Sequence, residues 1–173
     1  MISGFRGVDP SIDPTAFVAA NAVVIGDVVI GAQSSVWFQS VVRADVGPIR
    51  IGARTNLQDH VVVHVLSGGR AATVLGDDVT IGHRVILHGC VIGNRSLIGM
   101  GSVLLDDVEI GDDCLIGAGS LVTPGTKVPS GRLVLGNPAR VVRELRDDER
   151  AKLVESAANY VAYAIEYRAS DIR

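Results

Sequence analysis

Aromatic residues and cysteines are scarce in this chain, and long apolar runs are absent from it. Aromatics make up 4% of its 173 residues, and 2 cysteines are too few for the disulfide framework of a small secreted domain. No apolar run approaches the ~20 residues of a membrane span, and no basic segment followed by an apolar core opens the sequence. We therefore expect a cytoplasmic protein that does not bind a membrane.

An excess of basic residues is also absent. The chain has 16 lysines and arginines against 19 acidic residues, which gives a net charge of −3. Proteins that bind nucleic acid usually present a basic surface, so we expect no nucleic-acid partner. The length fits a single domain, residues 1–173.

The sequence instead has an aliphatic residue at every sixth position. This spacing continues without a break through Ile92, Ile98, Leu104, Ile110, Ile116 and Val122. Hexapeptide repeats of this kind are typical of stacked β-coils, in which three repeats close one coil. Glycines follow many of the aliphatic positions and suit the bends between short strands. The pattern predicts a mainly β protein, a parallel β-helix over about residues 11–135.

Two segments interrupt the repeat. Val46–Ile49 introduces an offset of three residues, and Ser67–Ala72 contains no large aliphatic residue, so we expect the latter to loop out. After the repeats, helical spacing predicts a C-terminal helix over about residues 144–168, with Asp147 or Asp148 as N-cap. We expect its apolar face to pack on the solenoid or on a neighbouring subunit, and this face comprises Leu153, Val154, Ala157, Tyr160, Val161, Ala164 and Ile165.

Three of the four histidines fall in register with other polar residues. His64 and His88 each follow a repeat aliphatic and are one coil apart once the interrupting segment is removed. Residues one coil apart on parallel strands stack about 4.8 Å from each other. Arg43 holds the equivalent position one coil before His64, after correction for the three-residue offset. These three residues should form one file along an edge of the solenoid.

Asp59 and His83 form a second file, which Gln58 adjoins. Five extended residues separate His83 from His88, so their backbones should stand roughly 16 Å apart. Metal-bound imidazole nitrogens lie at about 2.0–2.1 Å from the ion, so one chain cannot bring all three histidines to one ion. A closed three-fold assembly removes this difficulty by joining the two files of neighbouring chains.

The register therefore predicts a homotrimer with a metal bound by His64, His83 and His88 at each interface. Three protein ligands leave one position of a tetrahedral ion open, which is the catalytic arrangement rather than the structural one. The fourth histidine, His60, lacks this register, and we expect it on the surface.

The repeats together with four motifs resemble the γ-class carbonic anhydrase family. The motifs are Arg43-Ala-Asp45, Asn56-Leu-Gln-Asp-His60, Gly82-His-Arg-Val-Ile-Leu-His88 and Gly136-Asn-Pro-Ala139. The resemblance covers essentially the whole chain and implies a left-handed β-helix. It also implies a bound Zn²⁺, or alternatively Fe²⁺ or Co²⁺, and reversible hydration of carbon dioxide to bicarbonate by metal-bound hydroxide.

The resemblance further implies roles for five residues around the metal. Arg43 is expected to pair with Asp59 across the subunit interface, and Asp45 to help hold that contact. Gln58 is expected near the metal-bound water, with Asn56 supporting the same wall of the site.

The sequence departs from the family pattern where a proton carrier is expected. Val46 replaces an acidic residue, and Val65–Ala72 contains no carboxylate. We therefore expect slow or conditional activity, with Tyr160 reaching a neighbour's site if the helix packs there. Two alternatives remain, a metal-dependent thioesterase or other hydrolase using the same site, and a hexapeptide acyltransferase with one catalytic base and a coenzyme A groove. A non-catalytic trimeric scaffold is a fourth possibility.

Overall fold

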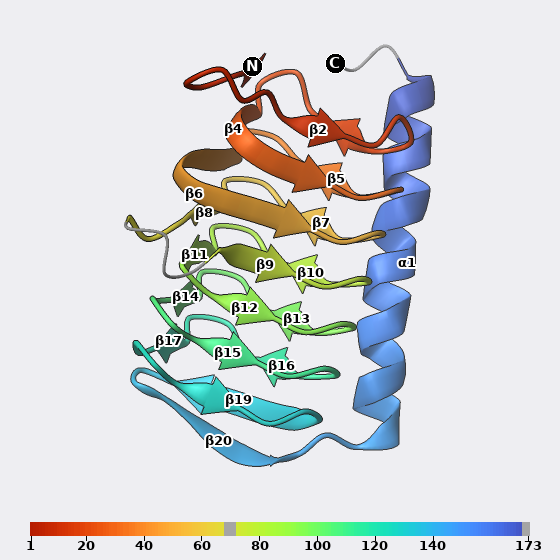
Figure 1. Cartoon of the computed structure of the whole chain (residues 1–173). Helices are drawn as coiled ribbons and strands as arrows, with labels where there is room; N and C mark the ends of the chain where they lie inside the picture. The colour runs from red at the N-terminus through yellow and green to blue at the C-terminus, as the bar shows by residue number, and fades with distance from the viewer. Residues whose placement is uncertain (68–71, 171–173) are drawn as a thin grey trace.

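The chain folds into a solenoid of parallel β-coils flanked by one long helix. The computed structural model describes residues 1–67 and 72–170. About seven turns wind left-handedly from the N-terminus downwards, and the C-terminal helix α1 runs along one side (Figure 1). The sequence-based prediction of a mainly β, left-handed parallel β-helix is confirmed. No helix in these described ranges is long and apolar enough to cross a membrane.

Each coil contributes one short strand to each of three faces. The first face consists of β3 (Phe17–Val18), β5 (Ser35–Val36), β7 (Asn56–Leu57), β10 (Thr80–Ile81), β13 (Leu97–Ile98), β16 (Leu115–Ile116) and β19 (Arg132–Gly136). The second face consists of β8 (Val62–His64), β11 (Ile86–His88), β14 (Val103–Leu104) and β17 (Leu121–Val122). The third consists of β2 (Ser11–Ile12), β9 (Thr73–Leu75), β12 (Val91–Ile92), β15 (Glu109–Ile110) and β18 (Lys127–Val128).

Two long strands, β4 (Val23–Ile30) and β6 (Val41–Ile51), bend from the second face to the third. From Gly26 to Val28 the strand β4 advances by two residues, whereas the paired strand β6 advances by five, from Ala44 to Ile49. The predicted three-residue offset is thus confirmed, and it is absorbed as a bulge inside β6. The other interrupting segment separates β8 from β9, and its residues 68–71 lie outside the described part of the chain.

The repeat aliphatics form the core. Leu57, Ile81, Ile98 and Ile116 stack in register along the first face, and all four are fully buried. Burying one such side chain contributes about 1.5–3 kcal/mol. The coils approach so closely that a Cβ on Gly31 would lie 2.6 Å from the carbonyl carbon of the glycine one coil below. Close stacking therefore explains why glycine recurs at this corner.

Both ends of the solenoid extend further than the repeat predicts. At the N-terminus, β1 (Ile2–Ser3) already pairs in parallel with β4. At the other end, β19 continues the first face and pairs antiparallel with β20 (Ala139–Glu144), which lies beyond the predicted end of the solenoid. Neither β1 nor β20 continues the six-residue aliphatic spacing, which is why periodicity did not predict them, whereas Val134 of β19 is in phase with Ile116 and Val122.

Helix α1 (Asp147–Ala169) begins after Arg146, so the predicted cap at Asp147 or Asp148 is wrong. The side chain of Glu149 instead reaches back and accepts the Arg146 backbone N–H at 2.9 Å. Acidic residues in the first turn also face the positive end of the helix dipole.

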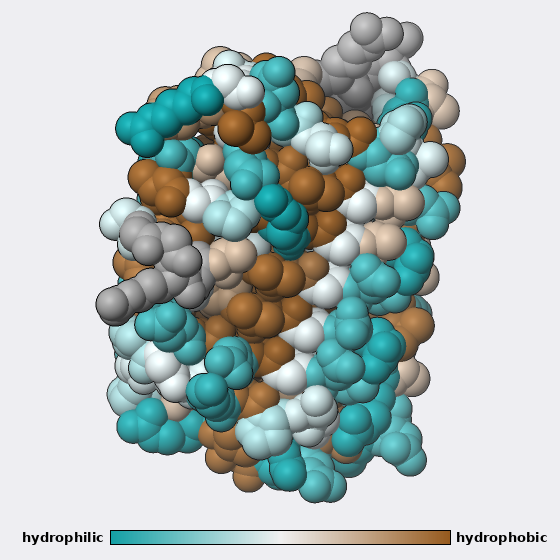
Figure 2. Space-filling model, in the orientation of Figure 1, coloured by the Kyte–Doolittle hydropathy of each residue, from teal (hydrophilic) through white to brown (hydrophobic). Residues whose placement is uncertain are grey.

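The helix packs on the first face, against β3, β5, β7 and β10. Leu153, Ala157 and Ala164 are buried there, as predicted. Val154 and Ile165 are 49% and 60% exposed, so the buried stripe is narrower than expected. Figure 2 shows hydrophobic residues continuing as a band down the solenoid beside the polar surface of the helix.

Candidate metal centre

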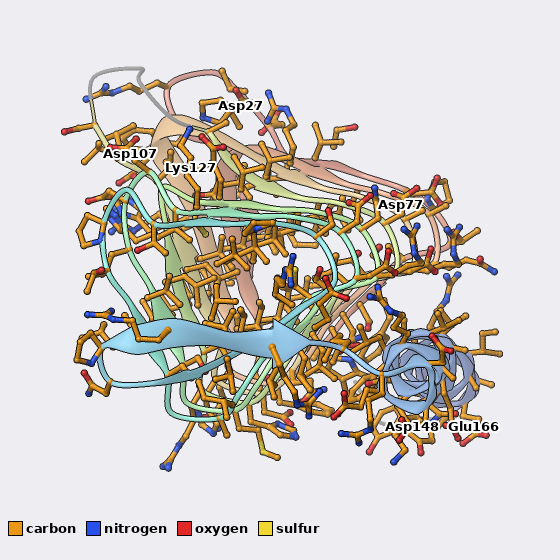
Figure 3. The ribbon with its side chains drawn as sticks, turned by 90° about the horizontal axis from the view of Figure 1, so that it is seen from below. Asp27, Asp77, Asp107, Lys127, Asp148 and Glu166 are labelled. Carbon is orange, nitrogen blue, oxygen red and sulfur yellow. The ribbon has the colours of Figure 1, made fainter. Side chains whose placement is uncertain are left out.

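Two edges of the solenoid carry the three histidines that share a register. We call the edge between the second and third faces the histidine-pair edge, and it carries Asp45, His64, His88 and Asp106. The edge between the first and second faces is the single-histidine edge, and it carries Asp59 and His83. Seen along its axis the solenoid is triangular, with Asp107 labelled at the corner beside the histidine-pair edge (Figure 3).

His64 and His88 stack at the ends of neighbouring strands. The two residues are direct partners in the pairing of β8 with β11, which confirms the predicted file. Their ring centroids are 5.1 Å apart, and Nδ1 of His64 lies 3.1 Å from Nε2 of His88. The side chains are 19% and 32% exposed, so solvent reaches both rings.

A carboxylate holds the outer nitrogen of each ring in this pair. Asp45 Oδ1 lies 2.9 Å from His64 Nε2, and Asp106 Oδ1 lies 2.5 Å from His88 Nδ1. A carboxylate can only accept a hydrogen bond, so it selects the tautomer with the proton on that outer nitrogen. In the neutral form, both inner nitrogens then present lone pairs to each other.

Facing lone pairs repel unless a positive charge lies between them, and a proton or a metal ion can supply it. Two nitrogens bound to one tetrahedral ion at about 2.0–2.1 Å are about 3.3 Å apart. The 3.1 Å between His64 Nδ1 and His88 Nε2 is close to that separation. The pair therefore fits two of the ligands of a zinc-like ion. Within residues 1–67 and 72–170, no group of three metal-ligating side chains converges.

The single-histidine edge repeats the same pairing once. Asp59 Oδ2 lies 2.9 Å from His83 Nδ1, and Asp59 Oδ1 accepts the backbone N–H of Phe38 at 3.2 Å. The predicted file of Asp59 and His83 is confirmed. The carboxylate favours the tautomer with the proton on Nδ1, which leaves the lone pair of His83 Nε2 available to bind a metal ion.

Asp106 was missed in the sequence analysis. It lies 18 residues after His88, which is one uninterrupted coil. That spacing was the available signal, but both files predicted from the sequence span the interrupted coils and end at His83 and His88.

Arg43 forms an ion pair with Asp45 of its own chain. The hydrogen bond with His64, followed by the pairing with Arg43, lowers the pKa of the Asp45 carboxyl below its ordinary value. Asp45 is therefore ionised at neutral pH and remains an acceptor for His64. The expected contact of Arg43 with Asp59 of a neighbouring subunit stays a prediction.

A chain of hydrogen bonds connects Gln58 to helix α1. Gln58 Nε2 donates to Asn56 Oδ1 at 3.3 Å, and Asn56 Nδ2 donates to Thr80 Oγ1 at 3.0 Å. Thr80 in turn donates to Ser156 Oγ of the helix at 3.2 Å. Both amides are buried, so these bonds fix their orientation, and among the described residues Gln58 Oε1 accepts no hydrogen bond.

Tyr160 lies on the single-histidine edge of its own chain, where Trp37, Asp59 and Tyr160 border the same hollow. Burial, followed by the negative charge of Asp59, raises the pKa of the Tyr160 phenol, so it stays protonated at neutral pH.

His60 is exposed, as predicted. Cys90 is buried, and burial raises the pKa of its thiol to about 12, so it is not a nucleophile.

The coil geometry defines a hexapeptide-repeat β-solenoid protein. The histidine–carboxylate pairs place candidate metal ligands on two of its edges. The family model described as bacterial transferase hexapeptide (six repeats) matches residues 72–104 and 89–124. A solved structure titled as a putative acetyltransferase from Bacillus cereus is 43% identical, with a TM-score of 0.95 and coverage of 98% of this chain and 97% of that one.

Two curated relatives narrow the class. The carbonic anhydrase of Geobacillus kaustophilus is 44% identical over 169 residues, which cover 98% of this chain and 92% of that protein. Gamma carbonic anhydrase 1, mitochondrial, of Arabidopsis thaliana is 46% identical over 155 residues, 87% of this chain but 56% of the relative. The chain thus spans little more than half the length of such plant relatives. It belongs to the γ-class carbonic anhydrase family.

Proposed function

We propose that this chain is a metal-dependent enzyme that hydrates carbon dioxide reversibly to bicarbonate. One observation carries the proposal: all three histidines, His64, His83 and His88, have a carboxylate on one ring nitrogen and leave the other nitrogen available. Second-shell carboxylates of this kind orient histidine ligands of zinc and increase their basicity. The names of the bacterial and plant relatives support the same reaction.

The ion proposed is Zn²⁺, with Fe²⁺ or Co²⁺ as alternatives. When bound, it would supply the Lewis acidity that makes water nucleophilic near neutral pH. His64 and His88 would hold it from one subunit and His83 from the next, while Asp45 and Asp106 keep the first two rings in the neutral tautomer.

The other polar residues would act on the attacking water and on the bicarbonate product. Gln58 offers Oε1 as an acceptor, because its amide nitrogen is already bound to Asn56. That oxygen can hold the O–H of the attacking water and so orient a lone pair towards carbon dioxide. Arg43, 44% exposed beside Asp45, provides a cation for the bicarbonate product or for a neighbouring subunit.

A homotrimer is proposed because neither edge holds three ligands. The second face lies between the two histidine edges and presents apolar side chains to solvent. Val62 and Ile86 on this face, next to His64 and His88, are 38% and 41% exposed. Covering them in a closed assembly would bury apolar surface and bring the two kinds of edge together.

Proton release limits the proposed activity. Val46 is exposed in the position where the family pattern has an acid, and it cannot carry a proton. Tyr160 stays protonated at neutral pH and is a poor acceptor. We therefore expect slower turnover than in relatives that have the acidic carrier, with stronger dependence on added buffer.

Metal analysis combined with stopped-flow hydration of carbon dioxide tests the proposal. The purified chain should hold about one zinc per subunit and hydrate carbon dioxide, with a rate that increases with imidazole concentration. His83→Ala should lose both properties. Absence of stoichiometric metal after zinc supplementation would sink the proposal.

A metal-dependent hydrolase or thioesterase using the same ligands is the second candidate. The missing acidic carrier favours it, because slow ester hydrolysis does not need rapid proton export. Zinc without carbon dioxide hydration, together with thioester cleavage that His83→Ala abolishes, would establish this candidate. A hexapeptide acyltransferase, which the name of the Bacillus cereus neighbour supports, would instead transfer acyl groups from coenzyme A without metal.

A further inference from the structure

A methionine lies directly below His83 on the single-histidine edge. Strand β10 pairs with β13, which places Met100 one coil below His83, and the backbone N–H of Gly101 donates to the carbonyl oxygen of His83 at 2.8 Å. The Met100 side chain is 59% exposed, whereas the other exposed large apolar side chains described between residues 17 and 128 are 38–41% exposed. Methionine is a frequent residue at binding surfaces, so this exposure suits a contact with another chain.

The histidine-pair edge has an apolar residue in the same coil as Met100. Strand β11 pairs with β14 below it, which places the half-buried Leu105 one coil below His88 (Figure 1). His83 and His88 are five residues apart in one coil, and Met100 and Leu105 are five residues apart in the next. The coil below the proposed metal ligands therefore repeats their two positions with apolar side chains.

The two edges present complementary residues in successive coils. A rotation about an axis parallel to the solenoid keeps every coil at its height, so in a closed three-fold assembly the two edges of one coil meet between neighbouring chains. From the upper coil downwards the five-residue pairs are an acid with a base, two candidate metal ligands, two apolar residues and two small residues. These pairs are Asp59 with His64, His83 with His88, Met100 with Leu105, and Ala118 with Thr123.

We propose that Met100 of one subunit and Leu105 of the next form an apolar floor of the metal pocket, against which the uncharged substrate docks. The inference rests on the proposed function, because it takes the shared metal site as its starting point. Neighbouring parallel strands are about 4.8 Å apart, so side chains one coil below the ligands can contact a small molecule held beside them.

The proposed floor gives the pocket two unlike sides. Gln58 and Asp59 belong to the coil above His83 and supply polar groups there. Met100 and Leu105 supply no hydrogen-bond donor. Carbon dioxide has no net charge and loses little when it leaves water for an apolar surface, whereas bicarbonate would lose the hydration of its charge. The floor therefore favours docking of the substrate over retention of the product and leaves the polar side to the attacking water.

Cysteine cross-linking tests where Met100 lies in the assembly. The two natural cysteines are buried, so Met100→Cys and Leu105→Cys each introduce one accessible thiol. When the two variants are mixed into one trimer, a short bismaleimide should give covalent dimers, with zinc or with a chelator, while each variant alone should give none. Val91→Cys, 41% exposed on the third face, replaces Leu105→Cys as the matched control and should not cross-link to Met100→Cys. Verified mixed trimers without cross-linked dimers would overturn the proposal.

Substitution of Met100 tests the docking role by stopped-flow hydration of carbon dioxide. Met100→Gln keeps the length of the side chain but adds an amide to the floor, so kcat/KM should fall about 10-fold. Because proton release limits turnover, kcat should change by less than about 2-fold. Met100→Leu restores an apolar side chain and should recover most of the lost kcat/KM, and Val91→Gln on the third face is the matched control.

Zinc content and circular dichroism accompany these measurements. Met100 is exposed, so Met100→Gln should fold and keep about one zinc per subunit. An unchanged kcat/KM, equal losses in Met100→Gln and Met100→Leu, or loss of zinc in place of the change in KM would overturn the docking role.

The floor and the proposed function fail separately. A zinc-loaded chain that hydrates carbon dioxide but neither cross-links nor responds to Met100→Gln would keep the proposed function and lose the floor. A chain that cross-links but binds no zinc would lose the proposed function and keep the contact between Met100 and Leu105.

Discussion

The histidine-pair edge brings together two imidazoles and two carboxylates, whereas the single-histidine edge holds one imidazole and one carboxylate. The stacked residues of both edges have the same sequence separation, because 24 residues separate His64 from His88 and also separate Asp59 from His83. In each case the step is one coil plus the interrupting segment. The identity of the stacked residues, and not the backbone, makes the edges different.

The two edges differ in which coils supply the histidines and which supply the carboxylates that contact them. On the histidine-pair edge both stacked positions are proposed metal ligands, and the carboxylates that contact them come from other coils, Asp45 above and Asp106 below. On the single-histidine edge one stacked position is the proposed ligand and the other is the carboxylate that contacts it. Each histidine therefore has one carboxylate, yet neither edge provides three ligands.

The largest expected effect comes from breaking the histidine-pair edge. His88→Ala removes one of two ligands that one chain contributes, so zinc should fall from about one per subunit to none under the same loading conditions. Inductively coupled plasma mass spectrometry on dialysed protein measures this. His60→Ala, an exposed histidine outside both edges, is the matched control and should keep its zinc. Full zinc occupancy in His88→Ala would contradict the site.

Mixing variants of the two edges tests whether they meet between chains. His64→Ala spoils only the histidine-pair edge, and His83→Ala spoils only the single-histidine edge. In randomly mixed trimers about one quarter of the interfaces should join two intact edges, so about that fraction of zinc binding should return. Each variant alone should bind none. Verified mixed trimers that recover no zinc would rule out a shared site.

A smaller effect is expected from the orienting carboxylates. Asp106→Asn keeps the shape of the side chain but no longer selects the His88 tautomer, so zinc affinity should fall about 10- to 100-fold without loss of stoichiometry at saturation. Competition with a chromogenic chelator measures the affinity. Asp107→Asn, a neighbouring exposed substitution, should leave it unchanged. Equal affinities for the two variants would mean that Asp106 does not orient the ring.

Periodicity predicted the coils and the stacking of both histidine files, because a repeat of fixed length determines which residues lie above one another. It did not predict β20, whose antiparallel pairing depends on a reversal of the chain between Gly136 and Ala139. It also did not predict that α1 would begin directly after Arg146. There the acceptor for the cap N–H comes from Glu149, three residues inside the helix.

Side-chain partners were predicted less well than backbone register. Asp59 was placed beside His83 because both belong to one file, but Asp45 reaches His64 from a coil that contains the bulge. A bulge changes where side chains point, and periodicity carries no information about that. Periodicity also did not predict the ring contacts of Trp37 with Tyr160 and Tyr167, because the two tyrosines come from a helix more than one hundred residues later in the chain.

The smallest expected effect concerns the helix that covers the single-histidine edge. Arg143 and the backbone N–H of Arg146 stabilise the ionised Glu149, which lowers its pKa from 4.5 to about 2. Because the folded-state pKa lies below the unfolded one, this contribution to stability is complete above about pH 4.5 and is lost as the pH falls towards 2. Glu149→Gln should therefore destabilise the chain at neutral pH and make its stability depend less on pH across that window.

Urea unfolding followed by far-ultraviolet circular dichroism between pH 2 and 6 measures this difference. The gap between the wild-type and Glu149→Gln midpoints should be widest above about pH 4.5 and should close towards pH 2. Glu155→Gln, exposed on the same helix, is the matched control and should follow the wild-type profile. The proposed ligands His64 and His88 end strands of the second face, whereas α1 packs on the first. Glu149→Gln should therefore lower stability at neutral pH without lowering the zinc stoichiometry of the folded chain, and a parallel loss of zinc would mean that α1 also supports the histidine-pair edge.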